Sequence, residues 1–180
     1  MNNVKLLLLS LLLVMFNQVE LKASGRTQSL IPGSKEENSL VGENYIDFKE
    51  QDPNGRNHRL SHYVGKGKWV LVDFWASWCG PCKREMPYVV EAYKKYHKSG
   101  FEIVGISLDV NRENWKEAIK TWGMNWVHLS DLKGWQSKVG RLYGIEGIPD
   151  NILISPEGII VAKDLRGEAL AEKLDEIFTK

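Results

Sequence analysis

The only two cysteines of the chain stand three positions apart, directly after a strongly apolar segment. Residues 69–75 read Trp-Val-Leu-Val-Asp-Phe-Trp, and this nearly unbroken apolar character predicts a β-strand that is buried on both faces of a sheet. Cys79 and Cys82 follow, and from there the apolar residues recur at helical spacing. Cys79 therefore stands at the start of a helix, where free backbone N–H groups and the helix dipole favour an anion. Because a thiolate is the anion that attacks disulfides, the pair predicts redox chemistry.

The composition is that of one ordinary globular domain. The chain has 180 residues, of which 43% are hydrophobic and 26% charged. Because 24 Lys and Arg residues stand against 23 Asp and Glu residues, the charge gives no reason to expect nucleic acid or anionic lipid as a partner.

The first 24 residues have the pattern of an export signal. Lys5 precedes an apolar run at 6–16, which suits the hydrophobic part of a signal peptide and is short for a membrane span. Residues 21–23, Leu-Lys-Ala, match a cleavage site only loosely, so a cleaved signal peptide and an uncleaved N-terminal membrane anchor both stay open. In either case we expect an exported domain that lies in the periplasm or is anchored facing it.

Residues 25–42 are polar and turn-rich and are expected to form a flexible linker, and 43–180 are expected to form one domain. The predicted elements are strands at 45–48 and 57–60 joined by a turn at 52–55, a helical turn at 61–64, a strand at 69–75, a helix from 79 to 100, a strand at 101–108, a helix after Asn111, a strand at 127–129, a short helix at 137–143, strands at 151–154 and 159–163, and a helix after Gly167. This order predicts an α/β fold with a central mixed β-sheet flanked by helices, an N-terminal β-hairpin and an inserted αβ segment. A Cys-x-x-Cys pair at the first helix of such an order is typical of a thioredoxin-like redox domain.

Three segments resemble known redox proteins. Residues 72–83 are similar to the thioredoxin active site, and 144–149 (Gly-Ile-Glu-Gly-Ile-Pro) resemble its second signature, in which the proline is cis. Residues 79–87 match the pattern C-x-x-C-x-x-E-x-P of the TlpA/ResA branch of thioredoxin-fold thiol-disulfide oxidoreductases, exported bacterial proteins related to the AhpC/TSA redoxins. The resemblance covers the whole predicted domain. Two residues depart from it, since relatives often carry Asn in place of Asp73 and usually Thr in place of Asp150.

The residues and the resemblance together predict a dithiol active site. Cys79 is expected to attack a substrate disulfide, and Cys82 to resolve the resulting mixed disulfide. Asp73 interrupts an apolar strand, so it should be buried and have a raised pKa or a partner. It is either a general base for Cys82, directly or through water, or a hydrogen-bonded structural acid. Glu85, one helical turn after Cys82, either shares the role of base or is a solvated surface acid. The resemblance further implies substrate contacts from Trp78, Gly80, Pro81, Ile148 and Pro149.

Pro149 is either an ordinary turn proline or, as the resemblance implies, a cis proline. In the second case the backbone of Ile148 would pair with an extended substrate chain. That arrangement would bring Asp150 close to Cys79, where its carboxylate should raise the thiol pKa and favour substrates with a basic residue near the target cysteine. Alternatively, Asp150 points into solvent or caps a backbone N–H.

Metal binding fits the sequence poorly, and we expect neither a metal nor an organic cofactor. His97 would lie roughly 22 Å from Cys82 on one helix, at 1.5 Å of rise per residue, so the two cannot share a zinc ion. Lys83 stands where covalent haem attachment needs His. A purely structural disulfide is also disfavoured, because closing so short a loop stabilises a fold by only about 2 kcal/mol.

The leading interpretation is an exported reductase of protein disulfides that acts as a monomer. The resemblance implies a membrane thiol-disulfide transporter as its electron donor, and a role in cytochrome c maturation or extracytoplasmic redox homeostasis. A net thiol oxidant or isomerase, a peroxidase and a Cu(I)-binding domain stay open as alternatives. Gly80 and Pro81 resemble thioredoxin rather than the strong oxidants. Ala76 replaces the threonine that peroxidases of this fold carry, and Met86 is the candidate extra copper ligand.

Overall fold

The computed structural model describes residues 40–179. The predicted signal or anchor segment, 1–24, and all but the end of the predicted linker lie outside the described residues. The strands are β1 (Lys49–Gln51), β2 (Asn57–Arg59), β3 (Trp69–Trp75), β4 (Phe101–Ser107), β5 (Val127–Leu129), β6 (Asp150–Ile154) and β7 (Ile160–Lys163), and the helices are α2 (Gly80–Tyr96), α3 (Arg112–Thr121), α4 (Lys138–Leu142) and α5 (Glu168–Phe178). Over residues 40–179, none of the helices is long and apolar enough to cross a membrane.

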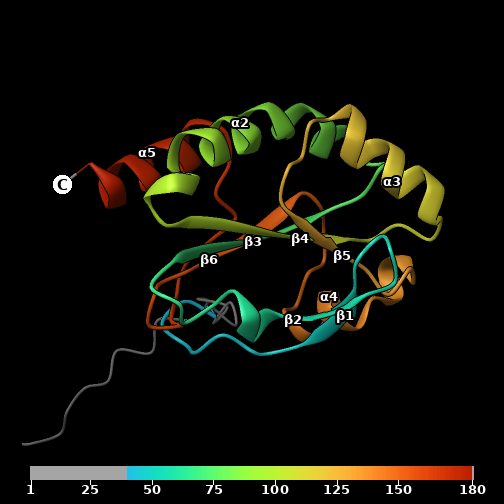
Figure 1. The fold of residues 1–180 in the computed structure, drawn as a ribbon, viewed down its shortest axis with the longest axis horizontal. Coiled ribbons are helices and arrows are strands. Elements are labelled where there is room, and N and C mark those ends of the chain that lie inside the picture. Colours follow the sequence, from blue (N-terminus) through green and yellow to red (C-terminus); the bar gives the residue numbers. More distant parts are fainter. Residues whose placement is uncertain (1–39, 180) are drawn as a thin grey trace, which may run out of the picture. The chain divides into compact units, whose positions relative to one another are not determined.

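The central sheet is mixed, as the sequence predicts. Its strand order is β5-β4-β3-β6-β7. The neighbours β3, β4 and β5 run parallel, whereas β6 is antiparallel to both β3 and β7. Helices α2, α3 and α5 lie over one face of this sheet, and α4 and the β1–β2 hairpin lie over the other (Figure 1). The carboxyl end of β3 thus leads directly into the segment that carries both cysteines.

The predicted strand at 45–48 is wrong, because the hairpin begins later, at Lys49. The backbone of Ile46 is bound elsewhere: its N–H donates to the hydroxyl of Tyr143 at 3.0 Å, and its carbonyl accepts from the same hydroxyl at 2.7 Å. A backbone whose donor and acceptor are satisfied by a side chain is not available to a strand partner. The hairpin itself forms as expected, with Lys49 opposite Arg59 in the register.

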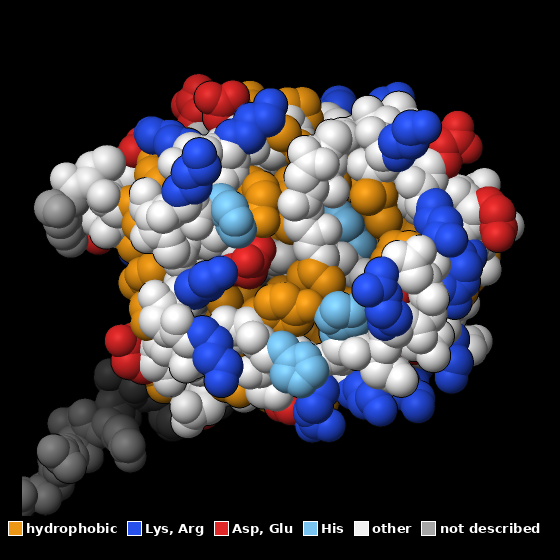
Figure 2. Space-filling view, in the orientation of Figure 1, with side chains coloured by type: hydrophobic (Ala, Val, Ile, Leu, Met, Phe, Trp, Pro, Cys, Tyr) orange, Lys and Arg blue, Asp and Glu red, His pale blue; other side chains and the backbone are white. Residues whose placement is uncertain are grey.

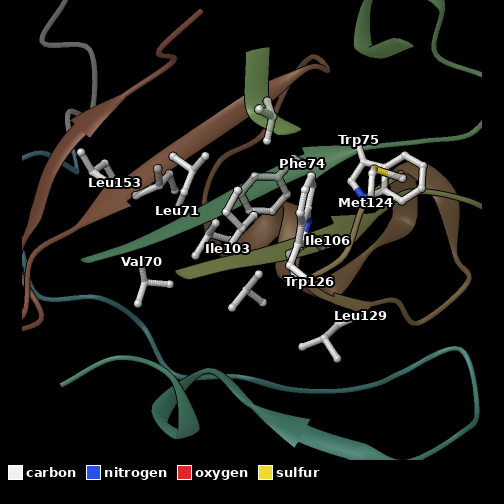
Figure 3. Close-up of a cluster of buried hydrophobic side chains, with 14 of the residues drawn as sticks. Val70, Leu71, Phe74, Trp75, Ile103, Ile106, Met124, Trp126, Leu129 and Leu153 are labelled. Atoms are coloured by element: carbon white, nitrogen blue, oxygen red, sulfur yellow. The ribbon is translucent and has the colours of Figure 1, made fainter. Parts of the chain in front are cut away.

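The helix that follows the cysteines buries one stripe of side chains against the sheet. The buried residues of α2 are Cys82, Met86, Val89, Ala92 and Tyr96, which follow the three- and four-residue spacing of one helix face. Pro87 lies inside the helix without ending it. On the sheet, Val70 and Leu71 of β3 point to opposite faces (Figure 3), as alternation in a strand requires. Both are fully buried, so β3 is the central, doubly covered strand.

Gly105 of β4 is the register partner of Asp73, and buried rings fill the place that a side chain on Gly105 would take. A Cβ atom on Gly105 would lie only 2.4 Å from Nδ1 of His128 and 3.1 Å from Nε1 of Trp75, so any side chain there would collide with the buried rings. The His128 and Trp75 rings meet edge to face, 5.4 Å apart. Because β4 offers Asp73 no side chain, the groups that act on this carboxyl come from other elements.

The face drawn in Figure 2 carries both signs of charge around its margins. Hydrophobic side chains are visible across its middle, between the helical layer above and the hairpin layer below (Figures 1 and 2). This distribution agrees with the near-neutral composition and with a sheet whose two faces are covered by separate layers.

Candidate active site

Cys79 is the N-cap residue of α2. Its backbone is extended, and its Sγ accepts a hydrogen bond from the backbone N–H of Cys82 at 3.1 Å. Pro81 occupies the first turn of the helix, where its missing N–H costs nothing and its fixed φ suits the helix. The Sγ atoms of Cys79 and Cys82 are joined in a disulfide. A thiolate formed at Cys79 after reduction would therefore lie against the unpaired N–H groups and the positive end of the dipole.

Both cysteines of the disulfide are buried. Cys82 is 1% exposed and Cys79 is 4% exposed, but the residues next to Cys79, Trp78 and Gly80, are both exposed. The predicted substrate residue Pro81 is exposed as well. Exposed residues thus surround the start of α2, where Cys79 is the N-cap residue and Cys82 lies inside the first turn.

The peptide bond between Ile148 and Pro149 is cis, as the resemblance implied. The carbonyl oxygen of Ile148 lies 3.7 Å from Sγ of Cys79, a contact rather than a hydrogen bond while the sulfur is oxidised. Both residues of this loop are half-buried. The loop therefore forms the wall of the site opposite the start of α2.

Asp73 is buried, as predicted, with 3% of its surface exposed. Its Oδ2 has no hydrogen-bond partner among the described residues. Burial raises the pKa of Asp73 to about 7; Arg166 opposes this, while the carboxyls of Glu85 and Asp150 add to it. A carboxyl that titrates near neutral pH can both accept and return a proton under physiological conditions.

Glu85 is half-buried and is not a solvated surface acid. Its Oε1 accepts a hydrogen bond from the backbone N–H of Gly167, the N-cap residue of α5. It also acts electrostatically on Asp73. Glu85 thus connects α2 to the start of α5, and its negative charge acts on the buried carboxyl of Asp73.

Of the two expectations for Asp150, the structure shows the one in which its carboxylate binds a backbone N–H. Asp150 is buried in β6, its Oδ1 accepts from the N–H of Asn151 at 2.7 Å, and its Oδ2 lies 3.7 Å from Nζ of Lys163. Burial raises its own pKa, and Lys163 opposes that effect. Since Asp150 pairs with Phe74 of β3, its side chain lies on the sheet face of Phe74 and not on that of Asp73, and its charge acts on Asp73 through space.

Sequence reasoning missed three residues around this site. Asn151 stands opposite Asp73 in the register and binds the backbone of Leu165 through both atoms of its amide. Arg166 donates to the carbonyl oxygen of Pro149. Trp135 is 53% exposed, and its ring centroid lies 6.1 Å from that of Trp78. These contacts join residues far apart in the chain, so no local pattern around Asn151, Arg166 or Trp135 indicated them.

Comparisons with known proteins agree with this geometry. The model of the AhpC/TSA family matches residues 41–163. The thiol-disulfide oxidoreductase ResA of Bacillus cereus is 32% identical over 147 residues, which are 82% of this chain and 82% of the relative. The ResA of Geobacillus thermodenitrificans is 34% identical over 140 residues, 76% of this chain and 78% of the relative.

Solved structures show the same relationship. A thiol-disulfide oxidoreductase from Bacteroides fragilis superposes with a TM-score of 0.70 at 36% identity, covering 75% of this chain and 99% of that one. A thiol:disulfide interchange protein from a Bacteroides species superposes with a TM-score of 0.70 at 35% identity, covering 78% of this chain and 91% of that one. With its Cys79–Cys82 disulfide at the start of α2, the chain belongs to the AhpC/TSA family with a thioredoxin-like fold, and it is a thiol-disulfide oxidoreductase similar to ResA.

Proposed function

We propose that this protein is an exported reductase of protein disulfides. The observation that carries the proposal is the position of the Cys79–Cys82 pair: Cys79 at the N-cap of α2, Cys82 inside its first turn, and the carboxyl of Asp73 buried on the adjoining strand. Export is supported by the apolar run at 6–16 behind Lys5. No step of this exchange needs an organic cofactor.

The reaction begins from the reduced protein. The Cys79 thiolate attacks one sulfur of the substrate disulfide, a new bond joins Cys79 to the substrate, and the other substrate sulfur leaves as a thiolate. Cys82 then gives its proton to Asp73, and its thiolate attacks Sγ of Cys79. The substrate's second sulfur is released as a thiolate that takes up a proton. Two electrons have passed from the protein to the substrate, and the protein is left with the disulfide that the structure contains.

Because each turnover leaves the protein oxidised, a second reductant must restore the dithiol. For an exported protein we propose a membrane thiol-disulfide reductase, and we propose apocytochrome c before haem attachment among the substrates. The chain is proposed to act as a monomer, either released into the periplasm or held at the membrane by its N-terminal segment.

The Cys79–Cys82 couple should be reducing. We expect its potential to lie nearer to about −270 mV, as in thioredoxin, than to about −120 mV, as in the strong oxidant DsbA. The reason is the similarity of Gly80 and Pro81 to the thioredoxin motif. Equilibration with glutathione or dithiothreitol buffers of known potential, with tryptophan fluorescence as the readout of the oxidised fraction, measures the potential. A potential near the oxidising end of this range would reverse the proposed direction of electron flow.

Two exposed aromatic rings beside the disulfide should contact substrate. Trp78 and Trp135 form a tilted pair in which each residue is 53% exposed. Aromatic rings that a bound protein covers contribute strongly to the free energy of binding. We expect Trp135→Ala to raise KM for a protein disulfide about tenfold, with little change for a small disulfide such as oxidised glutathione. The matched control is Val41→Ala, an exposed apolar residue beside the β7 edge. Equal effects on large and small disulfides would contradict a role in docking.

A further inference from the structure

The loop that joins β7 to α5, residues 164–167, contacts three parts of the redox site: Asn151 of β6, the Pro149 segment, and Glu85 of α2. Asn151 of β6 fixes it: the side-chain Nδ2 donates to the carbonyl of Leu165 at 2.7 Å, and Oδ1 accepts from the N–H of Leu165 at 3.0 Å. Since Asn151 is the register partner of Asp73, the loop is held directly beside the strand that carries the buried carboxyl.

Arg166 extends from this loop over the Pro149 segment. Its Nη2 donates to the carbonyl oxygen of Pro149 and also forms an ion pair with Asp164. Its Nη1 is buried and has no hydrogen-bond partner among residues 40–179. The following residue, Gly167, donates its N–H to Glu85.

The guanidinium of Arg166 opposes the effect of two neighbouring carboxyls on Asp73. Glu85 of α2 and Asp150 of β6 disfavour the ionised form of Asp73, while Arg166 favours it. Nζ of Lys163 in β7 lies 3.7 Å from Oδ2 of Asp150 and forms an ion pair with that carboxyl. Cys82 of α2 is the buried thiol that must lose its proton. The carboxyls of Glu85 and Asp150 thus both act on Asp73, and Arg166 is the cation that opposes them there.

We propose that Arg166 is a positioning residue for the exchange reaction, holding the Pro149 segment in place and supplying the positive charge that lets Asp73 take the Cys82 proton at neutral pH. The inference rests on the proposed function, in which Asp73 is the base for Cys82. The guanidinium touches neither sulfur in this arrangement. It acts through the Pro149 carbonyl on one side and through the buried carboxyl on the other.

The test is the pH dependence of the resolution step in the full chain. Rapid mixing of the reduced protein with a protein disulfide separates formation of the mixed disulfide from its resolution. Removing the charge in Arg166→Gln makes Asp73 harder to ionise, so we expect the midpoint of resolution to move upward by about one pH unit. That shift corresponds to resolution about tenfold slower at pH values below the midpoint. Arg166→Lys keeps the charge and should keep the midpoint of the parent.

Two further variants make the result decisive. Arg166→Met keeps the aliphatic stem and removes the charge, so it should give the same upward shift even if the Gln variant folds poorly. Arg56→Gln removes a charge from the hairpin, where the Arg56 side chain is 75% exposed, and should leave the midpoint unchanged. A midpoint that does not move in the Gln and Met variants overturns the inference, even if the rate falls. Absence of disulfide exchange in the parent protein would instead overturn the proposed function.

Discussion

Replacing Cys79 with Ser is expected to abolish disulfide exchange, whereas replacing Cys82 with Ser should trap the substrate on Cys79. The reason is geometric: Cys79 is the N-cap residue of α2 and its Sγ accepts from the N–H of Cys82 at 3.1 Å, while Cys82 lies inside the first turn of the helix. Without Cys79 no thiolate lies at the helix start. Without Cys82 the mixed disulfide has no resolving thiol.

Mass spectrometry of the trapped species measures this result. In Cys82→Ser mixed with an excess of a protein disulfide, the adduct should map to the peptide that contains Cys79. The double replacement of both cysteines is the matched control and should form no adduct. Reductase activity retained by Cys79→Ser would show that the roles of the two thiols are reversed.

Asp73→Asn should slow resolution of the mixed disulfide by about a hundredfold and leave its formation nearly unchanged. Formation needs only the Cys79 thiolate, whereas resolution needs a base for the buried Cys82. The pKa of Asp73, raised to about 7, suits that transfer at neutral pH. Rapid-mixing kinetics of both steps measure the effect, and the exposed acid Glu157 supplies the control variant, Glu157→Gln. Two unchanged rates would reduce Asp73 to a structural acid.

The same replacement should stabilise the fold at alkaline pH. Because the folded pKa of Asp73 is about 7 and its ordinary value is 3.8, the folded state holds this proton over a pH range in which the unfolded chain has lost it. Stability therefore falls as pH rises from about 4 to about 7, and the full cost persists above that range. We expect Asp73→Asn to raise the free energy of unfolding at pH 8 by about 2 to 4 kcal/mol.

Denaturant titrations at several pH values measure this second effect of the Asp73 replacement. Below about pH 4 the carboxyl is protonated in both states, so the parent and Asp73→Asn should then be nearly equal in stability. An advantage of Asp73→Asn that does not depend on pH would mean that it comes from packing and not from the buried charge.

The local elements of this fold follow from patterns that act over a few residues. The apolar run at 69–75 became β3, and the three- and four-residue spacing after Cys79 became the buried stripe of α2. Asn111 caps α3 through the N–H of Asn114, as a short polar side chain before a helical stretch predicts. The strand at 45–48 failed because Tyr143, nearly one hundred positions away in the chain, binds the backbone of Ile46. A pattern over a few residues cannot indicate a contact with a hydroxyl so far away in the chain.

The sequence by itself determined the chemistry: the spacing of Cys79 and Cys82, their place between a buried strand and a helix, and the carboxyl at position 73. Only the tertiary structure decided how that carboxyl is tuned. The groups around Asp73 come from α2, β6 and the loop before α5; antiparallel pairing of β6 with β3 and the hydrogen bonds of Asn151 to Leu165 bring the last two to Asp73. The charge of Arg166 and the direction of Asp150 depend on that pairing, because electrostatic interactions act through space and not along the chain.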